Sequence, residues 1–301
     1  MSSEQPPLVA IIMASMNHER FVVEAVESVF AQGYPNLRVV ICDDASTDSN
    51  YAKLQELASR FPIVLLKNEV RQGIVKTLNR CYAQCSDADY FYGLATDDVL
   101  QPGMIRACLA EIARWPEAGM LLGAHVNIDA EGRVMSEARV NGAARRITLD
   151  SPFERYYPSF QFHRGAFTRS AYPLPADMLG EDMYLFTFGV LSRFEVVQTD
   201  IAFILRRLHG NNTSLSQAYV TVVDNEWRCF PDSADKRRKM RVSYQRHMLC
   251  CLGLPNSSKE RFIPVFREVD WSWHYAAFRL SFLPPVRWGF SFVRWLIRSL
   301  R

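Results

Sequence analysis

The sequence lacks the features that mark membrane-spanning and secreted proteins. No apolar run approaches the roughly 20 residues that a helix needs to cross a bilayer. Residues 1–7 are polar and contain proline, without the basic and apolar stretches of a signal peptide, so we expect no secretion signal. The 7 cysteines are odd in number and show no metal-ligand spacing, which favours a reduced cytosolic compartment over a disulfide framework.

The sequence also lacks a strong excess of charge of either sign. The formal net charge is only +3, too mild to indicate a nucleic-acid partner, and we expect none. The chain has 301 residues, 49% of them hydrophobic and 22% charged, which is the composition of an ordinary globular protein. That length allows one large α/β domain with an appended region, or two domains.

Apolar segments in the first third of the chain each lead into polar residues and then into a helical pattern. The predicted strands are residues 8–14, 37–42, 63–66 and 90–94. Short continuous apolar runs, such as the first of these, are typical of parallel strands that are buried on both faces. The repetition of strand, polar loop and helix predicts a parallel sheet with right-handed crossovers.

The pattern becomes less regular further along the chain. Residues 119–128 predict another strand, 129–132 a hairpin turn, 179–191 a helix, and 194–208 one or two strands. Residues 141–162 carry few periodic signals. No element is predicted there.

The last part of the chain is predicted to be helical, with prolines between the helices, and we place a domain boundary near Gln217. Within residues 285–301, arginines recur on one face of a predicted helix, while tryptophan, phenylalanine and leucine occupy the other. A cationic and an aromatic face on a helix too short to span a bilayer are typical of a helix in the membrane interface. A terminal helix packed on its own domain is the alternative.

Two adjacent carboxylates, Asp97 and Asp98, follow the predicted strand 90–94. Open α/β sheets bind their ligands at the carboxyl ends of strands. Neighbouring carboxylates repel each other unless a cation shares them, and Mg²⁺ and Mn²⁺ prefer oxygen ligands. The pair therefore predicts a divalent-metal site, and a helix N-cap at Asp98 beside a solvated neighbour is the alternative.

Polar motifs recur in a fixed order at the ends of the predicted strands. They are Ser15-Met16-Asn17-His18-Glu19, Asp43-Asp44-Ala45-Ser46-Thr47-Asp48, Asn68 to Asn79 with Gly73, Thr96-Asp97-Asp98, Gly180-Glu181-Asp182 and Arg207-Leu208-His209-Gly210-Asn211-Asn212. In this order they resemble the motifs of the family 2 glycosyltransferases, over residues 8–214. The resemblance implies the GT-A fold, a Rossmann-like, mostly parallel sheet with flanking helices, as the catalytic domain in residues 1–216. A helical C-terminal region, residues 217–301, would follow.

The resemblance also implies a function. Members of this family transfer a sugar from a nucleotide-diphosphate sugar to a hydroxyl, with inversion at the anomeric carbon. For this chain we expect a UDP-sugar donor and a glycan or lipid-linked acceptor, in the synthesis of a bacterial envelope or capsular polysaccharide. We expect a cytoplasmic enzyme held at the inner face of the membrane by residues 285–301.

Roles for individual residues follow from the motifs they resemble. Asp182 is expected to be the general base, supported by Glu181. Asp98 and His209 are expected to bind Mn²⁺ or Mg²⁺, which would stabilise the departing diphosphate. Donor contacts are expected from Ser15, Asn17, Glu19, Asp44, Arg71, Asp97, Asp98 and Arg207. The alternatives are ordinary ones: Asp44 as a turn residue or N-cap, His209 as a surface residue, and Glu181 and Asp182 as carboxylates facing a helix dipole.

The chain departs from the family pattern at three positions. Met16 replaces an aromatic residue that lies beside the base of the nucleotide in the family, and Ala45 replaces a frequent glycine. Thr96 replaces the first aspartate of the metal motif, which leaves Asp98 as the expected carboxylate ligand. Met16 and Thr96 keep open a catalytically inert GT-A-like binding subunit. A nucleotidyltransferase is a further alternative, but it usually has a glycine-rich basic loop after its first strand, and residues 14–20 contain no glycine.

Overall fold

The computed structural model describes residues 5–136, 143–148, 160–176, 178, 181–209, 230–231 and 233–236. The chain divides into two compact units, residues 1–148 with 156–216 and residues 149–155 with 217–301. All the elements below belong to the first unit. The predicted boundary at Gln217, most of the predicted C-terminal helices, and the interfacial helix at 285–301 lie outside the described residues and stay predictions.

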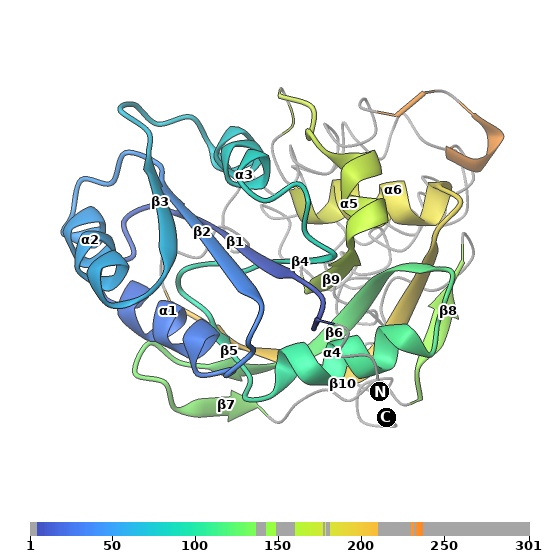
Figure 1. Cartoon of the computed structure of the whole chain (residues 1–301), viewed down its shortest axis with the longest axis horizontal. Helices are drawn as coiled ribbons and strands as arrows, with labels where there is room; N and C mark the ends of the chain where they lie inside the picture. Colours follow the sequence, from blue (N-terminus) through green and yellow to red (C-terminus); the bar gives the residue numbers. More distant parts are fainter. Residues whose placement is uncertain are drawn as a thin grey trace, which may run out of the picture. The chain divides into compact units, whose positions relative to one another are not determined.

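Strands and helices alternate through the first half of the chain (Figure 1). The strands are β1 (Val9–Ser15), β2 (Leu37–Asp43), β3 (Ile63–Lys67), β4 (Tyr90–Gly93), β5 (Val99–Leu100), β6 (Ala118–Ile128), β7 (Val134–Ser136), β8 (Arg145–Ile147), β9 (Gln161–Arg164) and β10 (Glu195–Arg207). The helices are α1 (Val22–Phe30), α2 (Asn50–Arg60), α3 (Ile74–Ala83), α4 (Met104–Ala113), α5 (Gly165–Ala171) and α6 (Glu181–Leu191).

The strands form one mixed sheet in the order β3-β2-β1-β4-β9-β6-β10-β5, with β7 paired to β6 and β8 to β10. β3, β2, β1 and β4 are parallel, as predicted. β9 runs antiparallel between β4 and β6, and β10 is parallel to β6. The predicted class, a mostly parallel α/β sheet with flanking helices, is confirmed.

The register of the central strands decides where the polar loops begin. Ser15 at the end of β1 lies opposite Asp43 at the end of β2. β4 is shorter, because its last residue, Gly93, lies opposite Ile12 rather than opposite Ser15. Residues 94–98 therefore continue past the end of β4 along the edge of the sheet, and Asp97 lies in this loop instead of at the strand's end.

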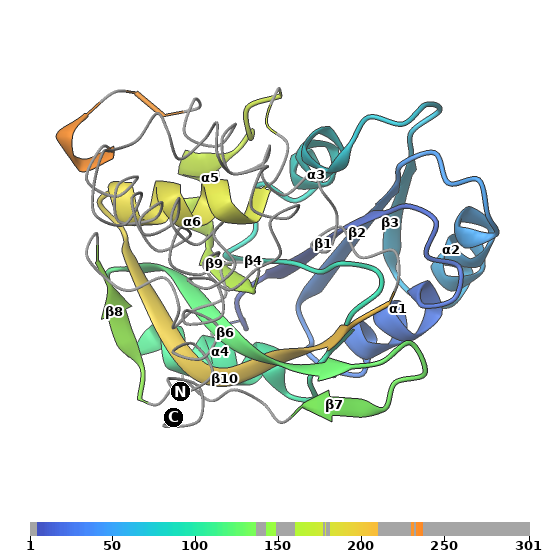
Figure 2. The same ribbon diagram turned by 180° about the vertical axis from the view of Figure 1, so that it is seen from behind.

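Helices cover both faces of the sheet (Figures 1 and 2). α1 and α4 lie on one face, and α3, α5 and α6 lie on the other. On the first face, alternate residues of β1, Val9, Ile11 and Met13, join one apolar core with Val22 and Val26 of α1. The buried positions of α1 recur at helical spacing, which is why this segment forms an amphipathic helix against the sheet.

Several predicted elements need correction. The weakly patterned residues 141–162 contain β8 and the start of β9, and α5 follows without having been predicted. β9 is only 4 residues long, too short to show a period in the sequence, and its place in the sheet comes from pairing on both sides. Residues 194–208 form one long strand, β10, with register shifts against β6. Among the described residues, no helix has the length and apolar character needed to cross a membrane.

Candidate active site

The carboxyl ends of β1, β2 and β4 meet at one edge of the sheet, because these strands are parallel neighbours. The loops that continue from them comprise residues 16–21, 44–49 and 94–98. β10 ends at the same edge, since it runs parallel to β6 and Leu205 pairs with Val99 just after the third loop. Side chains from four separate parts of the sequence are thereby brought together.

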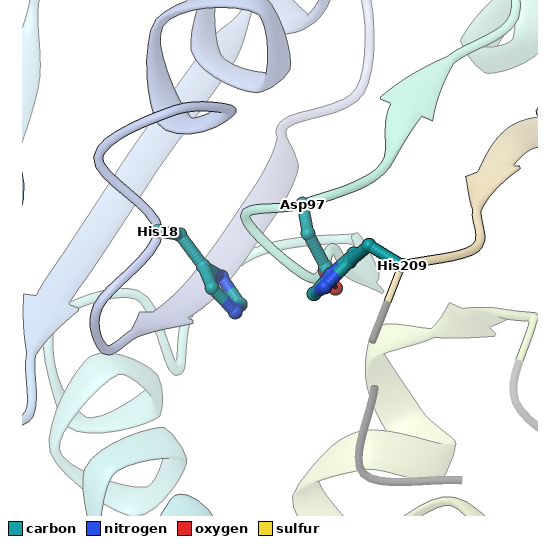
Figure 3. Close-up of side chains that lie close together, drawn as sticks. All are labelled: His18, Asp97 and His209. Atoms are coloured by element: carbon teal, nitrogen blue, oxygen red, sulfur yellow. Dashed lines mark hydrogen bonds and ion pairs between the residues drawn. The ribbon is translucent and has the colours of Figure 1, made fainter. Parts of the chain in front are cut away.

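Two imidazoles and a carboxylate converge at this edge (Figure 3). His18 follows β1, Asp97 follows β4, and His209 follows β10. One ligand atom from each lies within 4.8 Å of the other two. Nε2 of His209 lies 3.0 Å from Oδ2 of Asp97, and the His18 and His209 rings meet edge to face with centroids 6.2 Å apart.

A chain of hydrogen bonds holds His18 in place. Nδ1 of His18 lies 2.8 Å from Oγ1 of Thr96, and the Thr96 hydroxyl donates to Oγ of Ser15 at 3.0 Å. Nδ2 of Asn50 donates to the same Ser15 oxygen at 2.9 Å. Thr96, Ser15 and Asn50 are all buried, so the chain runs into the protein interior. Thr96 therefore orients an imidazole.

Burial lowers the pKa of His18, and although the Asp97 charge raises it, His209 lowers it further, so the balance is a lowered pKa. A lowered pKa keeps the ring neutral at pH 7. Neutral imidazole is the form that binds a metal ion.

The structure corrects the prediction that Asp98 is the carboxylate beside His209. Asp97 occupies that place, and Asp98 instead accepts a hydrogen bond from the backbone N–H of Arg207, at 2.8 Å from Oδ1. Burial raises the pKa of Asp98 to about 8, with a further contribution from the neighbouring Asp97 charge. If Asp97 is the metal ligand, the three-residue metal motif comprises Ala95, Thr96 and Asp97 instead of Thr96, Asp97 and Asp98. Ala95, and not Thr96, then stands where the family has its first aspartate.

Arg207 is also placed differently from the prediction. Its side chain is only 2% exposed. Nε donates to the backbone oxygen of Asp97 at 3.0 Å, and an Nη2–H donates to Oε2 of Glu24 at 2.5 Å. The guanidinium also reaches the carbonyls of Asp129 and Ala130 in the hairpin turn. Arg207 thus braces the loop that carries Asp97.

Asn17 and Glu19 connect the loop after β1 to the loop after β2. Oδ1 of Asn17 accepts from the N–H of Thr47 at 2.8 Å, and Oε2 of Glu19 accepts from the N–H of Ser49 at 2.9 Å. The N–H of Glu19 in turn donates to Asp48 at 3.1 Å. Asn17 and Glu19, which were predicted to contact the sugar donor, therefore hold two neighbouring loops together, and Ser15 likewise bonds to other parts of the protein.

Asp44 anchors the start of α3. Its carboxylate accepts from the N–H groups of Gln72 and Gly73 at 2.7 and 2.8 Å and from Nδ2 of Asn68 at 2.7 Å. Burial raises the pKa of Asp44, but these hydrogen bonds outweigh it and lower the pKa overall. Arg71, just before them, has an exposed side chain, and no described contact places it at the cluster.

Glu181 and Asp182 form the start of α6, both partly buried. Burial raises the pKa of Glu181 to about 7, and the Asp182 charge raises it further. The backbone oxygen of Asp182 accepts from Nε2 of Gln161 on β9 at 2.6 Å, which ties this helix start to the sheet. Gly180, and Asn211 and Asn212 of the last motif, lie outside the described residues.

The chemistry of the cluster suits a divalent metal ion. Asp97 and His209 offer one carboxylate oxygen and one imidazole nitrogen, and His18 lies within reach of both. Mn²⁺ accepts such a mixed set of ligands. The sequence prediction missed His18, although a histidine in the polar loop after the first strand was a signal that it could have used.

Comparison with known proteins agrees with the predicted family. The model of one family, Glycosyl transferase family 2, matches residues 10–171. A chondroitin synthase of Escherichia coli is 29% identical over 212 residues, which cover 70% of this chain and 30% of the synthase. A UDP-Glc:alpha-D-GlcNAc-diphosphoundecaprenol beta-1,3-glucosyltransferase, WfaP of E. coli, is 32% identical over 30% of this chain and 36% of its own length. The chain thus spans about a third of the length of these relatives.

Solved structures share the fold. The structure of S. aureus TarS 1-349 in complex with UDP-GlcNAc is similar with a TM-score of 0.67 at 16% identity, over 94% of this chain and 91% of that one. The mannosyltransferase PcManGT from Pyrobaculum calidifontis, in complex with GDP-Man and Mn²⁺, has a TM-score of 0.59 at 14% identity, over 97% and 86%.

Proposed function

The chain belongs to glycosyl transferase family 2, and we propose that it transfers a sugar from a nucleotide-diphosphate sugar to a hydroxyl of a glycan or lipid-linked acceptor, with inversion. The observation that carries this proposal is the cluster of Asp97, His209 and His18 at the carboxyl edge of the sheet, where such folds bind their ligands. A UDP-sugar is the favoured donor. Support comes from TarS with UDP-GlcNAc and from WfaP, whose name includes UDP-Glc.

In this proposal Asp97 and His209 would hold a divalent metal ion that serves the donor's diphosphate. Mn²⁺ or Mg²⁺ in that place would act as a Lewis acid toward the charge that develops on the leaving diphosphate. Arg207 serves the same end indirectly, because its bond to the backbone of Asp97 fixes the loop that presents the carboxylate. This assignment replaces Asp98, whose Oδ1 is taken up by the backbone of Arg207.

In this proposal the loops after β1, β2 and β3 bind the nucleotide-sugar donor. Asp44 orders the N–H groups of Gln72 and Gly73 at the start of α3. Asn17 and Glu19 fix the spacing between two of these loops. Arg71 is exposed and free to meet a phosphate or sugar, a role that we keep from the motif it resembles.

Asp182 is the proposed general base. In the transfer, the acceptor oxygen bonds to the anomeric carbon as the bond from that carbon to the diphosphate oxygen breaks, and the acceptor proton passes to a carboxylate. Asp182 stands at the helix start where the motif places this group, next to Glu181. The raised pKa of Glu181, about 7, makes it a protonated neighbour for part of the physiological range, which limits repulsion when Asp182 is ionised.

A test of this function measures release of nucleoside diphosphate from a panel of UDP-, GDP- and dTDP-sugars in Mn²⁺. We expect release from at least one donor, and a loss of roughly 10²-fold in turnover for Asp182→Asn with donor affinity little changed. The inert binding subunit and the nucleotidyltransferase make different predictions. The former would bind a donor without turnover, and the latter would release pyrophosphate from a nucleoside triphosphate.

Contact with a membrane surface is proposed from the sequence alone, through residues 285–301. WfaP, whose name gives a diphosphoundecaprenol acceptor, shows that a relative acts on a lipid-linked glycan. Removing residues 285–301 should release the protein from anionic vesicles without abolishing transfer to a soluble acceptor analogue. Unchanged sedimentation of the truncated protein with vesicles would count against the proposal.

A further inference from the structure

We infer that His18 is a third protein ligand of the proposed metal site, so that two imidazoles and one carboxylate hold the cation and select Mn²⁺ over Mg²⁺. This inference rests on the proposed function, because the cation is the one placed there at Asp97 and His209. It goes further in two respects. It adds a ligand from the loop after β1, and it predicts that the protein binds its metal before the donor arrives.

The positions of the three side chains support a shared ion. They come from three loops, and one ligand atom of each lies within 4.8 Å of the other two (Figure 3). Metal–ligand bonds of about 2.0–2.2 Å around one ion place their donor atoms roughly 3–4 Å apart, so only a small movement is needed to bring all three into its coordination sphere. Asp97 and His209, at 3.0 Å, already have that spacing.

The hydrogen bond on the other ring nitrogen of His18 is compatible with the tautomer that binds a metal through Nε2. The Thr96 hydroxyl can give its proton to Ser15, and the Thr96 oxygen then accepts from Nδ1–H of His18. Nε2 then carries the lone pair. Metal-binding histidines characteristically donate their second ring N–H to an oxygen in this way, which fixes both tautomer and ring orientation.

Buried residues at the inner end of this series of hydrogen bonds hold the Thr96 hydroxyl where it can orient His18. Ser15 accepts from Asn50 as well as from Thr96, and Nδ2 of Asn50 is also bonded to Oδ2 of Asp43 at 2.8 Å. A histidine that served only to brace its loop would need the Thr96 bond alone. The convergence with Asp97 and His209 is additional to it.

The ligand set has a consequence for metal choice. Mg²⁺ prefers oxygen ligands in near-ideal octahedral geometry and gives up its waters reluctantly. Imidazole nitrogen binds divalent first-row transition metals, and although Mn²⁺ is the weakest binder of that series, it accepts nitrogen more readily than the hard Mg²⁺ does. Two imidazoles and one carboxylate therefore favour Mn²⁺ in the donor-free protein, where no phosphate adds to the site.

The experiment is a titration of Mn²⁺ alone into the full-length, donor-free, chelator-treated protein, with free Mn²⁺ followed by electron paramagnetic resonance. The variants are His18→Ala, Thr96→Val and, as a matched control in the same loop, Met16→Leu. We expect one Mn²⁺ bound by the wild type and by Met16→Leu. Affinity should fall by at least about tenfold in His18→Ala, and to a smaller degree in Thr96→Val, which keeps all three ligands but loses the orienting hydroxyl.

Pulsed resonance on the bound ion provides a count of ligating nitrogens that needs no variant. Coupling to two imidazoles in the wild type supports the inference, and coupling to one overturns it. Displacement of Mn²⁺ by an equal concentration of Mg²⁺ overturns the selectivity. Unfolding midpoints without metal separate lost ligation from lost folding, since a folded His18→Ala with wild-type affinity for Mn²⁺ removes His18 from the site.

Failure of this inference and failure of the proposed function are distinguishable. If the wild type binds Mn²⁺ through one imidazole, or only when UDP is added, His18 is no ligand but Asp97 and His209 stand. If no Mn²⁺ binds with or without UDP, the metal site itself is absent, and both proposals fail.

Discussion

Nε2 of His209 lies 3.0 Å from Oδ2 of Asp97, although 112 residues separate the two in sequence. Two structural features produce this contact. β5 pairs with β10, which aligns the loop before β5 with the end of β10, and Arg207 bonds the backbone of Asp97. The features that hold this pair can be tested separately from the proposed chemistry.

Arg207 is the first of these features. Replacing it by lysine keeps the charge but loses most of its bonds to Asp97, the hairpin turn and Glu24, and we expect a destabilisation of about 2–5 kcal/mol. Glu24→Gln should cost less than about 1 kcal/mol, because the Glu24 side chain is 57% exposed and solvent screens the pair. Urea unfolding of both variants provides the comparison. Equal, small losses in the two would show that Arg207 does not brace the loop.

The choice between Asp97 and Asp98 shows what the sequence could and could not predict. Alternating strands and polar loops predicted that these side chains meet at one edge of the sheet, because the ends of parallel strands lie together whatever their loops contain. Which of the two adjacent aspartates faces His209 depends on the path of residues 94–98 after the short strand β4. The sequence cannot predict that path, because the two residues are of the same type. The structure resolves it through the bond from the N–H of Arg207 to Asp98.

Arg207 and His18 illustrate the same limit in a different way. A buried arginine that bonds three separate segments cannot be distinguished in sequence from one that meets a phosphate, because its partners are distant backbone carbonyls and one distant carboxylate. His18 was overlooked because its orientation depends on Thr96, 78 residues away. β9 was not predicted because its 4 residues are too few to show a periodic pattern.

Ala45 allows a test of backbone strain. Its φ of +59° lies in the left-handed region, which costs a non-glycine residue about 1–2 kcal/mol. Ala45→Gly removes that strain but gives the unfolded chain more freedom, by about 0.4–1 kcal/mol. We expect the variant to be as stable as the wild type or more stable, by up to about 1.6 kcal/mol.

The matched control for this change is Ala110→Gly, at an exposed position inside α4. There the same substitution should cost about 1 kcal/mol, since glycine is a poor helix former. Thermal unfolding of both variants is the measurement. Equal losses at the two positions would contradict the strain at Ala45.

His163 predicts a pH dependence of stability. Its ring is buried on β9, packs against Phe167 with centroids 5.0 Å apart, and shares a hydrogen bond with Gln161. Burial lowers the pKa of His163 from 6.5 to about 3. The unfolded chain therefore binds a proton between these values that the folded protein does not, so this residue's contribution is present above pH 6.5 and is lost as the pH falls toward 3.

The expected slope is up to about 1.4 kcal/mol of unfolding free energy per pH unit below 6.5. His163→Gln should lower stability at pH 7 but remove this share of the slope. Urea unfolding of both proteins between pH 7 and pH 5 measures the difference. Parallel pH profiles would mean that His163 titrates alike in the folded and unfolded states.

The central claim is that Asp97, with His209, holds a divalent metal ion against the donor's diphosphate. Calorimetric titration of UDP into the wild type, Asp97→Asn and Asp98→Asn, in Mn²⁺ and again in EDTA, tests it most directly. We predict that EDTA or Asp97→Asn weakens UDP binding by at least about tenfold, which is 1.4 kcal/mol. Asp98→Asn should retain most of the affinity, because an amide oxygen can still accept from the N–H of Arg207. Equal UDP affinity with and without the metal, or a loss in Asp98→Asn with none in Asp97→Asn, would contradict the account.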